Sequence, residues 1–108
     1  MKITNITSEV FEWERPGIWN GGHFYGPGRL HKVTVHTDEG ITGIGEGTLS
    51  PTWTGETRPG GLAVIRDLFA PELVGKDPRN INALMRRLNR VLVGNPFAKA
   101  AIDMALWD

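Results

Sequence analysis

The hydrophobic pattern of this chain changes its period near residue 60, and no other feature constrains the fold as strongly. Before that point apolar and polar residues alternate, most cleanly at 31–37, where Val33 and Val35 share one face of a strand. From Gly60 onward apolar residues recur at the spacing of a helix. Strands followed by helices in this order predict an α+β domain.

Three strands are predicted in the first part of the chain. The first covers residues 3–12, and the second covers residues 31–37. The tetrapeptide TDEG then supplies an Asp and a Gly suited to a short hairpin turn, after which ITGIGE forms the third strand. We therefore expect a three-stranded antiparallel meander.

Three glycines in the third predicted strand, Gly43, Gly45 and Gly47, look at first like a phosphate-binding loop. The dinucleotide fingerprint, however, needs Gly-x-Gly-x-x-Gly opening directly into a helix, and the spacing here is different. Glycine inside a strand marks a bulge or a place where another backbone comes close. We expect these glycines to relieve crowding in a strand that twists or lies against another backbone.

Two helices are predicted between residues 60 and 92. The first starts at Gly60 and is interrupted by Pro71, whereas the second has Asp77 as its N-cap and Pro78 at its first position. Each carries one apolar stripe that we expect to face the core. The stripes consist of Leu62, Ile65, Leu68 and Phe69 in the first helix, and of Ile81, Leu84, Met85, Leu88 and Leu92 in the second.

A third helix begins at Asn95 and Pro96 and has no recognisable end. Its last turn lacks a C-cap Gly or Asn, a basic residue and a following proline. Its alanine-rich side would let another backbone approach closely. Asp103 and Asp108 lie on this helix roughly 140° apart, so they are too far out of phase to share a ligand.

Composition excludes several classes of partner. Twelve basic and twelve acidic residues leave no net charge, so no basic field attracts nucleic acid or an anionic membrane. Cysteine is absent, which removes disulfides and thiolate metal ligands. The N-terminus has no apolar signal region, and no stretch is long enough for a membrane span. We expect a cytoplasmic protein of one domain.

Two connections, residues 13–30 and 47–59, are long for a small domain. Connections beyond ~12 to 15 residues without regular structure tend to be functional or disordered. The first contains four of the nine aromatic residues in the chain, together with five glycines. Because disordered segments are depleted in aromatics, this composition predicts a mobile loop that closes over a ligand.

The segments VHTDEGITGIGEG, LVGKDP and AAIDMALWD occur in this order and together resemble the N-terminal domain of the mandelate racemase and muconate lactonizing enzyme family, in the enolase superfamily. The resemblance covers the whole chain. It implies that residues 1–108 are a capping domain, an α+β unit with a three-stranded antiparallel meander and a helical bundle. The third helix would lead into a C-terminal TIM barrel that is absent from this chain, so its missing end is interpreted as a truncation. Asp103 and Asp108 would be structural residues that hydrogen-bond across this junction.

The resemblance also implies the chemistry of the complete enzyme. Family members abstract a proton α to a carboxylate, with Mg²⁺ stabilising the enediolate and a Lys or His as the base. These groups sit on the barrel, so no catalytic residue and no metal ligand is expected in this chain. The four lysines are too far apart to form the Lys-x-Lys pair of the family. The implied partners are a small-molecule carboxylate substrate, the chain's own barrel, and further copies in a homo-oligomer.

In the family, the loops after the first and third strands close over the barrel mouth and help to select the substrate. By position these loops are residues 13–30 and 47–57 here. The substrate-contacting residues implied by this resemblance are Trp19, Asn20, His23, Phe24, Tyr25, Trp53 and Thr54.

Several of these and neighbouring residues also have simpler interpretations. His23 fits an exposed loop histidine as well as a substrate contact, and Trp13 and Trp53 fit side chains packed beneath their loops. His31 and His36 lie inside a predicted strand and are expected to be structural.

Two functions remain open on these grounds. The first is the capping domain of an enolase-superfamily enzyme, inactive as a fragment. An acid-sugar dehydratase is preferred, because the first loop mixes polar donors with aromatics, and a racemase or cycloisomerase follows closely. The alternative is a free-standing binding module whose aromatic loops recognise a carbohydrate or a protein. That alternative would leave the apolar third helix without a partner surface.

Overall fold

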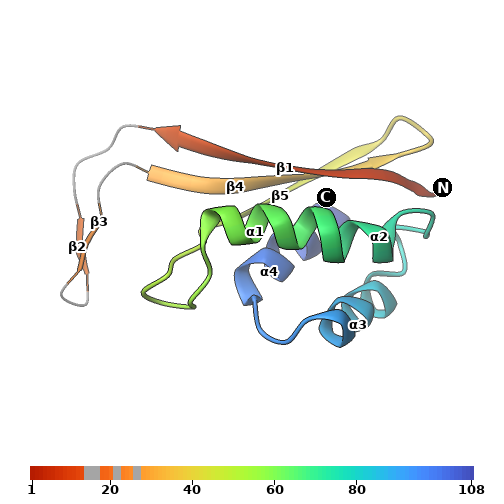
Figure 1. Ribbon diagram of the computed structural model, residues 1–108. Coiled ribbons are helices and arrows are strands. Elements are labelled where there is room, and N and C mark those ends of the chain that lie inside the picture. The colour runs from red at the N-terminus through yellow and green to blue at the C-terminus, as the bar shows by residue number, and fades with distance from the viewer. Residues whose placement is uncertain (14–17, 21–22, 26–27) are drawn as a thin grey trace.

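A three-stranded antiparallel sheet carries a layer of helices on one face (Figure 1). The computed structural model describes residues 1–13, 18–20, 23–25 and 28–108, with the backbone alone at 18–20 and 23–25. The sheet has the order β1–β4–β5, formed by β1 (Ile3–Trp13), β4 (Gly28–Thr37) and β5 (Thr42–Gly47). The predicted meander and the α+β class are therefore confirmed.

The first long connection contains regular structure that the sequence analysis did not predict. β1 and β4 remain paired as far as Trp13 and Gly28, and the chain between them includes β2 (Ile18–Asn20) and β3 (His23–Tyr25). These two short strands pair with each other in an antiparallel ribbon. Tryptophan, phenylalanine and tyrosine favour strands, and the Gly-Gly dipeptide between the two runs is a typical hairpin signal. The prediction of a connection without regular structure is wrong for these positions, whereas its closure over a ligand stays a prediction.

The first predicted helix continues through Pro71 instead of ending before it. It consists of α1 (Arg58–Val64), the π-helical segment η1 (Ile65–Phe69) and α2 (Ala70–Leu73). The amide of Ala70 donates to the carbonyl of Ile65, five residues earlier, so the turn before the proline is wide. A proline in a regular α-helix clashes with the carbonyl four residues before it, and a wider turn relieves this crowding.

The buried stripe of this helical segment differs from the predicted one. Ile65, Phe69 and Leu73 are buried, whereas Leu68 is exposed. The π-helical turn shifts the helical phase, so the predicted spacing no longer places Leu68 on the buried side.

The second predicted helix, α3 (Ile81–Val91), begins three residues later than expected. The carboxylate of Asp77 accepts a hydrogen bond from the amide of Arg79 at 2.9 Å, and the amide of Asn80 donates to the Asp77 carbonyl. Asp77 therefore stabilises a local turn, and Asn80 holds the N-cap position. The predicted apolar stripe is confirmed at its centre, where Leu84 and Leu88 are buried.

The third predicted helix, α4 (Pro96–Trp107), packs directly on the backbone of β5. A Cβ atom added at Gly43, Gly45 or Gly47 would collide with the backbone of α4. The expectation that these glycines lie against another backbone is confirmed. The core of the domain lies between the sheet and the helices and consists of Ile3, Ile6, Val33, Val35, Leu49, Ile65, Phe69, Leu73, Leu84, Leu88, Ala98, Ala101, Ile102 and Ala105.

Across the described ranges, no helix combines the length and the apolar character that crossing a membrane requires.

Candidate functional site

Both candidate segments leave the sheet at the same end. Trp13 at the end of β1 pairs with Gly28 at the start of β4, and Gly47 at the end of β5 pairs with His31 of β4. Figure 1 shows the β2–β3 ribbon and the connection from β5 to α1 on this side of the molecule. Two segments that are separated in the sequence by most of β4 and β5 are thus brought to one end of the domain.

Five of the predicted contact residues lie on the β2–β3 ribbon. Trp19 is directly opposite Phe24, and Asn20 is directly opposite His23, while Tyr25 pairs with Ile18. Their side chains lie outside the described part of the chain. Their register in the ribbon is known, and substrate contact by all five stays a prediction.

The second segment, residues 47–57, begins with the last residue of β5 and forms a compact turn around the carbonyl of Ser50. The amides of Trp53 and Thr54 donate to this carbonyl at 3.3 and 3.0 Å, and the Thr54 hydroxyl donates to it at 3.3 Å. Ser50 and its neighbour Leu49 are buried. The turn is therefore attached to the core at its first residues, with positions 51–53 and 55 exposed and Thr54 half-buried.

Trp53 is 58% exposed and Trp13 is 44% exposed. Each indole is therefore partly covered and partly exposed, and both interpretations of Trp13 and Trp53, packing beneath the loop and contact with a ligand, stay predictions. Trp13 ends β1 at the end of the sheet where the candidate segments lie, and Trp53 belongs to the second of these segments.

Glu56 connects the second segment to α4, although no motif in the sequence marks this residue. Its side chain is only 4% exposed, and its two carboxylate oxygens accept hydrogen bonds from the amides of Phe97 (3.1 Å) and Ala98 (3.0 Å). These amides belong to the first turn of α4, where backbone donors lack partners within the helix and favour negative charge. The carboxylate therefore caps α4 from a distant part of the chain.

Asn95 occupies the N-cap position of α4 as predicted, but it does not cap the helix with its side chain. Its backbone is left-handed, with φ of 55°, and its side-chain amide donates to the carbonyl of Val93 at 3.2 Å. Glu56 takes over the capping function. Because Glu56 and Phe97 are 41 residues apart, no local sequence pattern predicts this contact.

His31 is buried at the base of the second segment. It is 1% exposed, and within the described structure neither ring nitrogen has a hydrogen-bond partner. Burial lowers the pKa of His31, and the Arg58 cation lowers it further, whereas the Glu56 carboxylate opposes the shift. The imidazole therefore favours its neutral form. It also lies so close to Gly61 that a Cβ added there would be 3.1 Å from the ring.

His36 lies on the other face of β4. Its Nε2 is 3.3 Å from the hydroxyl of Thr7 on the neighbouring strand. These surroundings agree with the structural roles expected for His31 and His36.

The two acids of α4 differ in their surroundings. A carboxylate oxygen of Asp108 accepts a hydrogen bond from the amide of Ile44 at 3.0 Å, which ties the end of α4 to the edge of β5. This bond lies within the domain, and the hydrogen bond expected from Asp108 across a junction to the barrel stays a prediction. One carboxylate oxygen of Asp103 is buried without a partner among the described residues.

The described residues do not fit a Mg²⁺ site. Nowhere among them do three or more His, Asp or Glu side chains gather in a way that would hold a metal ion. Magnesium needs several oxygen ligands arranged around one point.

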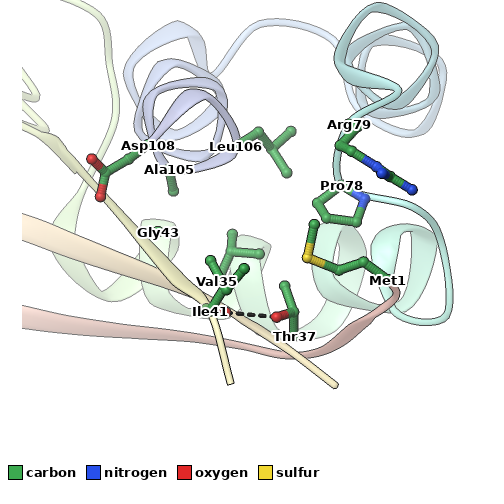
Figure 2. A pocket seen from close by; sticks show the side chains of 10 residues that line it. All are labelled: Met1, Val35, Thr37, Ile41, Gly43, Pro78, Arg79, Ala105, Leu106 and Asp108. Carbon is green, nitrogen blue, oxygen red and sulfur yellow. Dashed lines mark hydrogen bonds between the residues drawn. The ribbon is translucent and has the colours of Figure 1, made fainter. Parts of the chain in front are cut away.

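A small cavity opens at the opposite end of the sheet (Figure 2). It has a volume of about 120 Å³ and lies beside the β4–β5 hairpin, where the hydroxyl of Thr37 donates to the carbonyl of Ile41 at 2.7 Å. Typical ligand pockets measure roughly 300 to 1,000 Å³. This cavity is too small for such a ligand and is remote from both candidate segments.

Comparison with known proteins identifies the architecture. Residues 25–108 match the family model described as the mandelate racemase/muconate lactonizing enzyme, N-terminal domain. A cis-3-hydroxy-L-proline dehydratase from Roseibium aggregatum is 36% identical over 118 aligned positions, which cover all of this chain and 30% of that protein. A chloromuconate cycloisomerase from Pseudomonas putida is 44% identical over 71 positions, covering 64% of this chain and 19% of that protein.

Solved structures give the same result. The N-succinyl Arg/Lys racemase from Bacillus cereus superimposes with a TM-score of 0.93 at 32% identity, over 99% of this chain and 29% of the racemase. The chain therefore spans less than a third of the length of these relatives. The matched family model covers most of the sequence, and the chain belongs to the mandelate racemase/muconate lactonizing enzyme family of the enolase superfamily, corresponding to its N-terminal domain.

Proposed function

We propose that this chain is the N-terminal capping domain of a Mg²⁺-dependent enzyme that abstracts a proton α to a carboxylate. In this proposal the domain comprises residues 1–108 and acts together with a C-terminal barrel that carries the catalytic base and the metal. The complete enzyme is cytoplasmic and assembles as a homo-oligomer.

One structural observation supports this proposal most directly. The two segments that the family resemblance assigns to substrate selection leave the sheet at the same end, as the pairing of Trp13 with Gly28 and of His31 with Gly47 requires. A domain that contributes two separate segments to one substrate pocket needs them side by side. The exposed indole of Trp53 lies on one of these segments.

Within the proposed enzyme the two segments have complementary tasks. Trp19, Phe24 and Trp53 exclude water from the substrate, which strengthens electrostatic interactions around the reacting carboxylate. Polar side chains, namely Asn20, His23 and Tyr25, hydrogen-bond substrate groups and discriminate between acids. In this proposal the barrel supplies the ligands of the Mg²⁺ ion.

The substrate proposed first is an acid sugar undergoing dehydration, with racemisation or cycloisomerisation as close alternatives. The relatives include a cis-3-hydroxy-L-proline dehydratase, an N-succinyl-L-Arg/Lys racemase and a chloromuconate cycloisomerase. All three reaction types therefore belong in the first substrate panel. Acid sugars, hydroxyprolines, N-acyl amino acids and muconates should each be included.

The test measures deuterium incorporation at the α-carbon in D₂O, because proton abstraction can be detected before the product is known. The protein tested is the complete gene product that contains this sequence, supplied with Mg²⁺, and its intact mass is measured first. The control is a chain of residues 1–108 alone. The proposal predicts Mg²⁺-dependent exchange or turnover by the complete protein and none by the control.

Two outcomes would contradict the proposal. One is turnover by residues 1–108 alone. The other is a gene product of 11.9 kDa that binds a carbohydrate or a protein and exchanges no α-proton, which would favour the free-standing binding module.

A further inference from the structure

We propose that Glu56 is a positioning residue for substrate selection: by joining the turn at residues 50–56 to the first turn of α4, its carboxylate holds Trp53 and Thr54 in place. This inference rests on the proposed function, because it concerns the segment assigned to the substrate pocket.

The turn is held at both of its ends. At its beginning, the buried Ser50 accepts three hydrogen bonds through its carbonyl, two from backbone amides and one from the Thr54 hydroxyl. At its end, the Glu56 carboxylate is buried and binds the amides of Phe97 and Ala98. Between these two points Trp53 is exposed and Thr54 is half-buried. A segment held in this way presents a fixed surface and does not need to be ordered by the substrate.

The contact between Glu56 and the first turn of α4 favours a carboxylate over any neutral side chain. Both oxygens of Glu56 accept from amides, and the N-terminus of α4 carries partial positive charge. Hydrogen bonds to an ionised acceptor are shorter and stronger than those between neutral groups. Glutamine in the same place would turn its NH₂ group toward one of the two amides, so a donor would face a donor.

Helix capping alone does not account for the choice of this residue. A helix N-terminus is ordinarily capped by a local Ser, Thr, Asp or Asn. Asn95 stands at that position in α4 but directs its side-chain amide to Val93 instead. The cap therefore comes from the second segment, and the bond that completes the helix also fixes the position of Trp53, three residues before Glu56.

The positioning role of Glu56 is tested by comparing two substitutions in the complete enzyme, Glu56→Gln and Thr57→Ala. The Thr57 hydroxyl accepts from the amide of Gly60 and caps α1, so Thr57→Ala removes a cap next to Glu56 without affecting α4. Loss of an interaction that stabilises the bound substrate and the transition state equally raises KM and leaves kcat unchanged. We expect Glu56→Gln to raise KM roughly tenfold, which corresponds to about 1.4 kcal/mol, with little change in kcat. Thr57→Ala should raise KM far less than Glu56→Gln does, because the Glu56 carboxylate still joins the turn to α4.

A second measurement makes the result independent of the substrate. Amide hydrogen exchange should accelerate at Trp53 and Thr54 in Glu56→Gln, but not in Thr57→Ala. If Glu56→Gln fails to fold, Glu56→Asp keeps the charge with a shorter side chain, and we expect it to show an intermediate KM and intermediate exchange rates.

Failure of this inference can be distinguished from failure of the proposed function. If the unsubstituted protein turns over an acid and Glu56→Gln changes neither KM nor the exchange of the turn, Glu56 has no positioning role. An equal rise of KM in Thr57→Ala would also overturn the inference, because general loosening would then explain it. If the unsubstituted protein exchanges no α-proton, the proposed function fails, and the exchange of Trp53 and Thr54 still decides whether Glu56 positions the turn.

Discussion

The packing of α4 on β5 leaves no space for a methyl group at Gly45. A Cβ atom built there would lie 2.8 Å from the amide nitrogen of Ala105, 2.9 Å from the carbonyl carbon of Ala101 and closer still to the Ala101 oxygen. Ordinary contact begins at 3.4 Å, so α4 would have to move by at least 0.6 Å. All three atoms belong to helix backbone, which cannot move aside as a flexible side chain can. Gly45→Ala therefore requires α4 to shift as a unit.

The glycines of β5 match the helix through their spacing. Residues two apart on a strand are separated by about 6.6 Å, and residues four apart on a helix by about 6 Å. Gly43, Gly45 and Gly47 can therefore lie against successive turns of α4, and the backbone atoms nearest to them belong to Ala105, Ala101 and Phe97.

The expected cost of Gly45→Ala follows from this geometry. Overpacking a core costs typically about 1–3 kcal/mol and occasionally more, and we expect a value near the upper end, about 3 kcal/mol. With a shift of roughly 4–8 °C per kcal/mol for a domain of this size, the midpoint of thermal unfolding should fall by about 12–24 °C. An alanine in a strand without such contact would instead stabilise the protein by roughly 0.5–1 kcal/mol, because glycine loses more backbone entropy on folding. The sign of the effect is therefore informative.

The assay is thermal and urea-induced unfolding, followed by circular dichroism, of the Gly45→Ala and Gly47→Ala variants. At Gly47 the nearest backbone atom, the oxygen of Phe97, would be 2.7 Å from the added Cβ, so the cost should be smaller than at Gly45. Glu46→Ala, at an exposed position of the same strand, serves as the control and should change stability by less than about 0.5 kcal/mol. Unchanged or increased stability of Gly45→Ala would refute the direct packing of α4 on β5.

Three further predictions follow from other parts of the fold. Histidine in the unfolded chain binds a proton as the pH falls below about 6.5, whereas buried His31, with its lowered pKa, stays neutral. The free energy of unfolding should therefore be highest above pH 6.5. At lower pH it should decrease, by at most about 1.4 kcal/mol per pH unit. Urea unfolding between pH 8 and pH 5 should show this slope in the unsubstituted protein and lose it in His31→Leu; equal slopes would contradict the assignment. Phe69→Ala should lower the free energy of unfolding by about 3–5 kcal/mol, because the ring is fully buried. Leu68→Ala should lower it far less, because Leu68 is exposed. Similar losses in the two variants would mean that both residues face the core, as the sequence pattern predicts. Asp108→Ala should speed amide exchange at Ile44 and lower stability by about 1 kcal/mol, and an unchanged exchange rate would show that this hydrogen bond is absent in solution.

Much of the fold follows from patterns that are local in the sequence. Alternation at 31–37 predicts β4, and the glycines of β5 predict a close backbone before the partner is known. The start of α4 at Pro96 is also predicted correctly, because proline at a first helical position is a strong local signal.

Other features depend on competition between local signals. Asp77 and Pro78 have the form of a helix start, yet the Asp77 carboxylate binds the amide and guanidinium of Arg79 and forms a turn instead. The helix then begins only at Ile81. Likewise Pro71 does not end its helix, since a π-helical turn before it removes the steric conflict.

The candidate site is harder to predict because its key contact is not local. The position of Trp53 depends on Glu56, and the environment of Glu56 is formed by amides 41 and 42 residues away. Glu56 itself lies in a stretch that reads as an ordinary polar loop. A family resemblance points to the segment as a whole, whereas only the three-dimensional structure identifies which residue fixes it.

The central claim is that both candidate segments contact the substrate of an α-proton-abstracting enzyme. Hydrogen–deuterium exchange of the complete enzyme, with and without an acid that it turns over, tests this claim most directly. We predict that the acid slows amide exchange at 18–25 and at 50–56 and leaves the β4–β5 hairpin at 37–42, at the opposite end of the sheet, unchanged. Equal exchange with and without the acid in both candidate segments would contradict the claim.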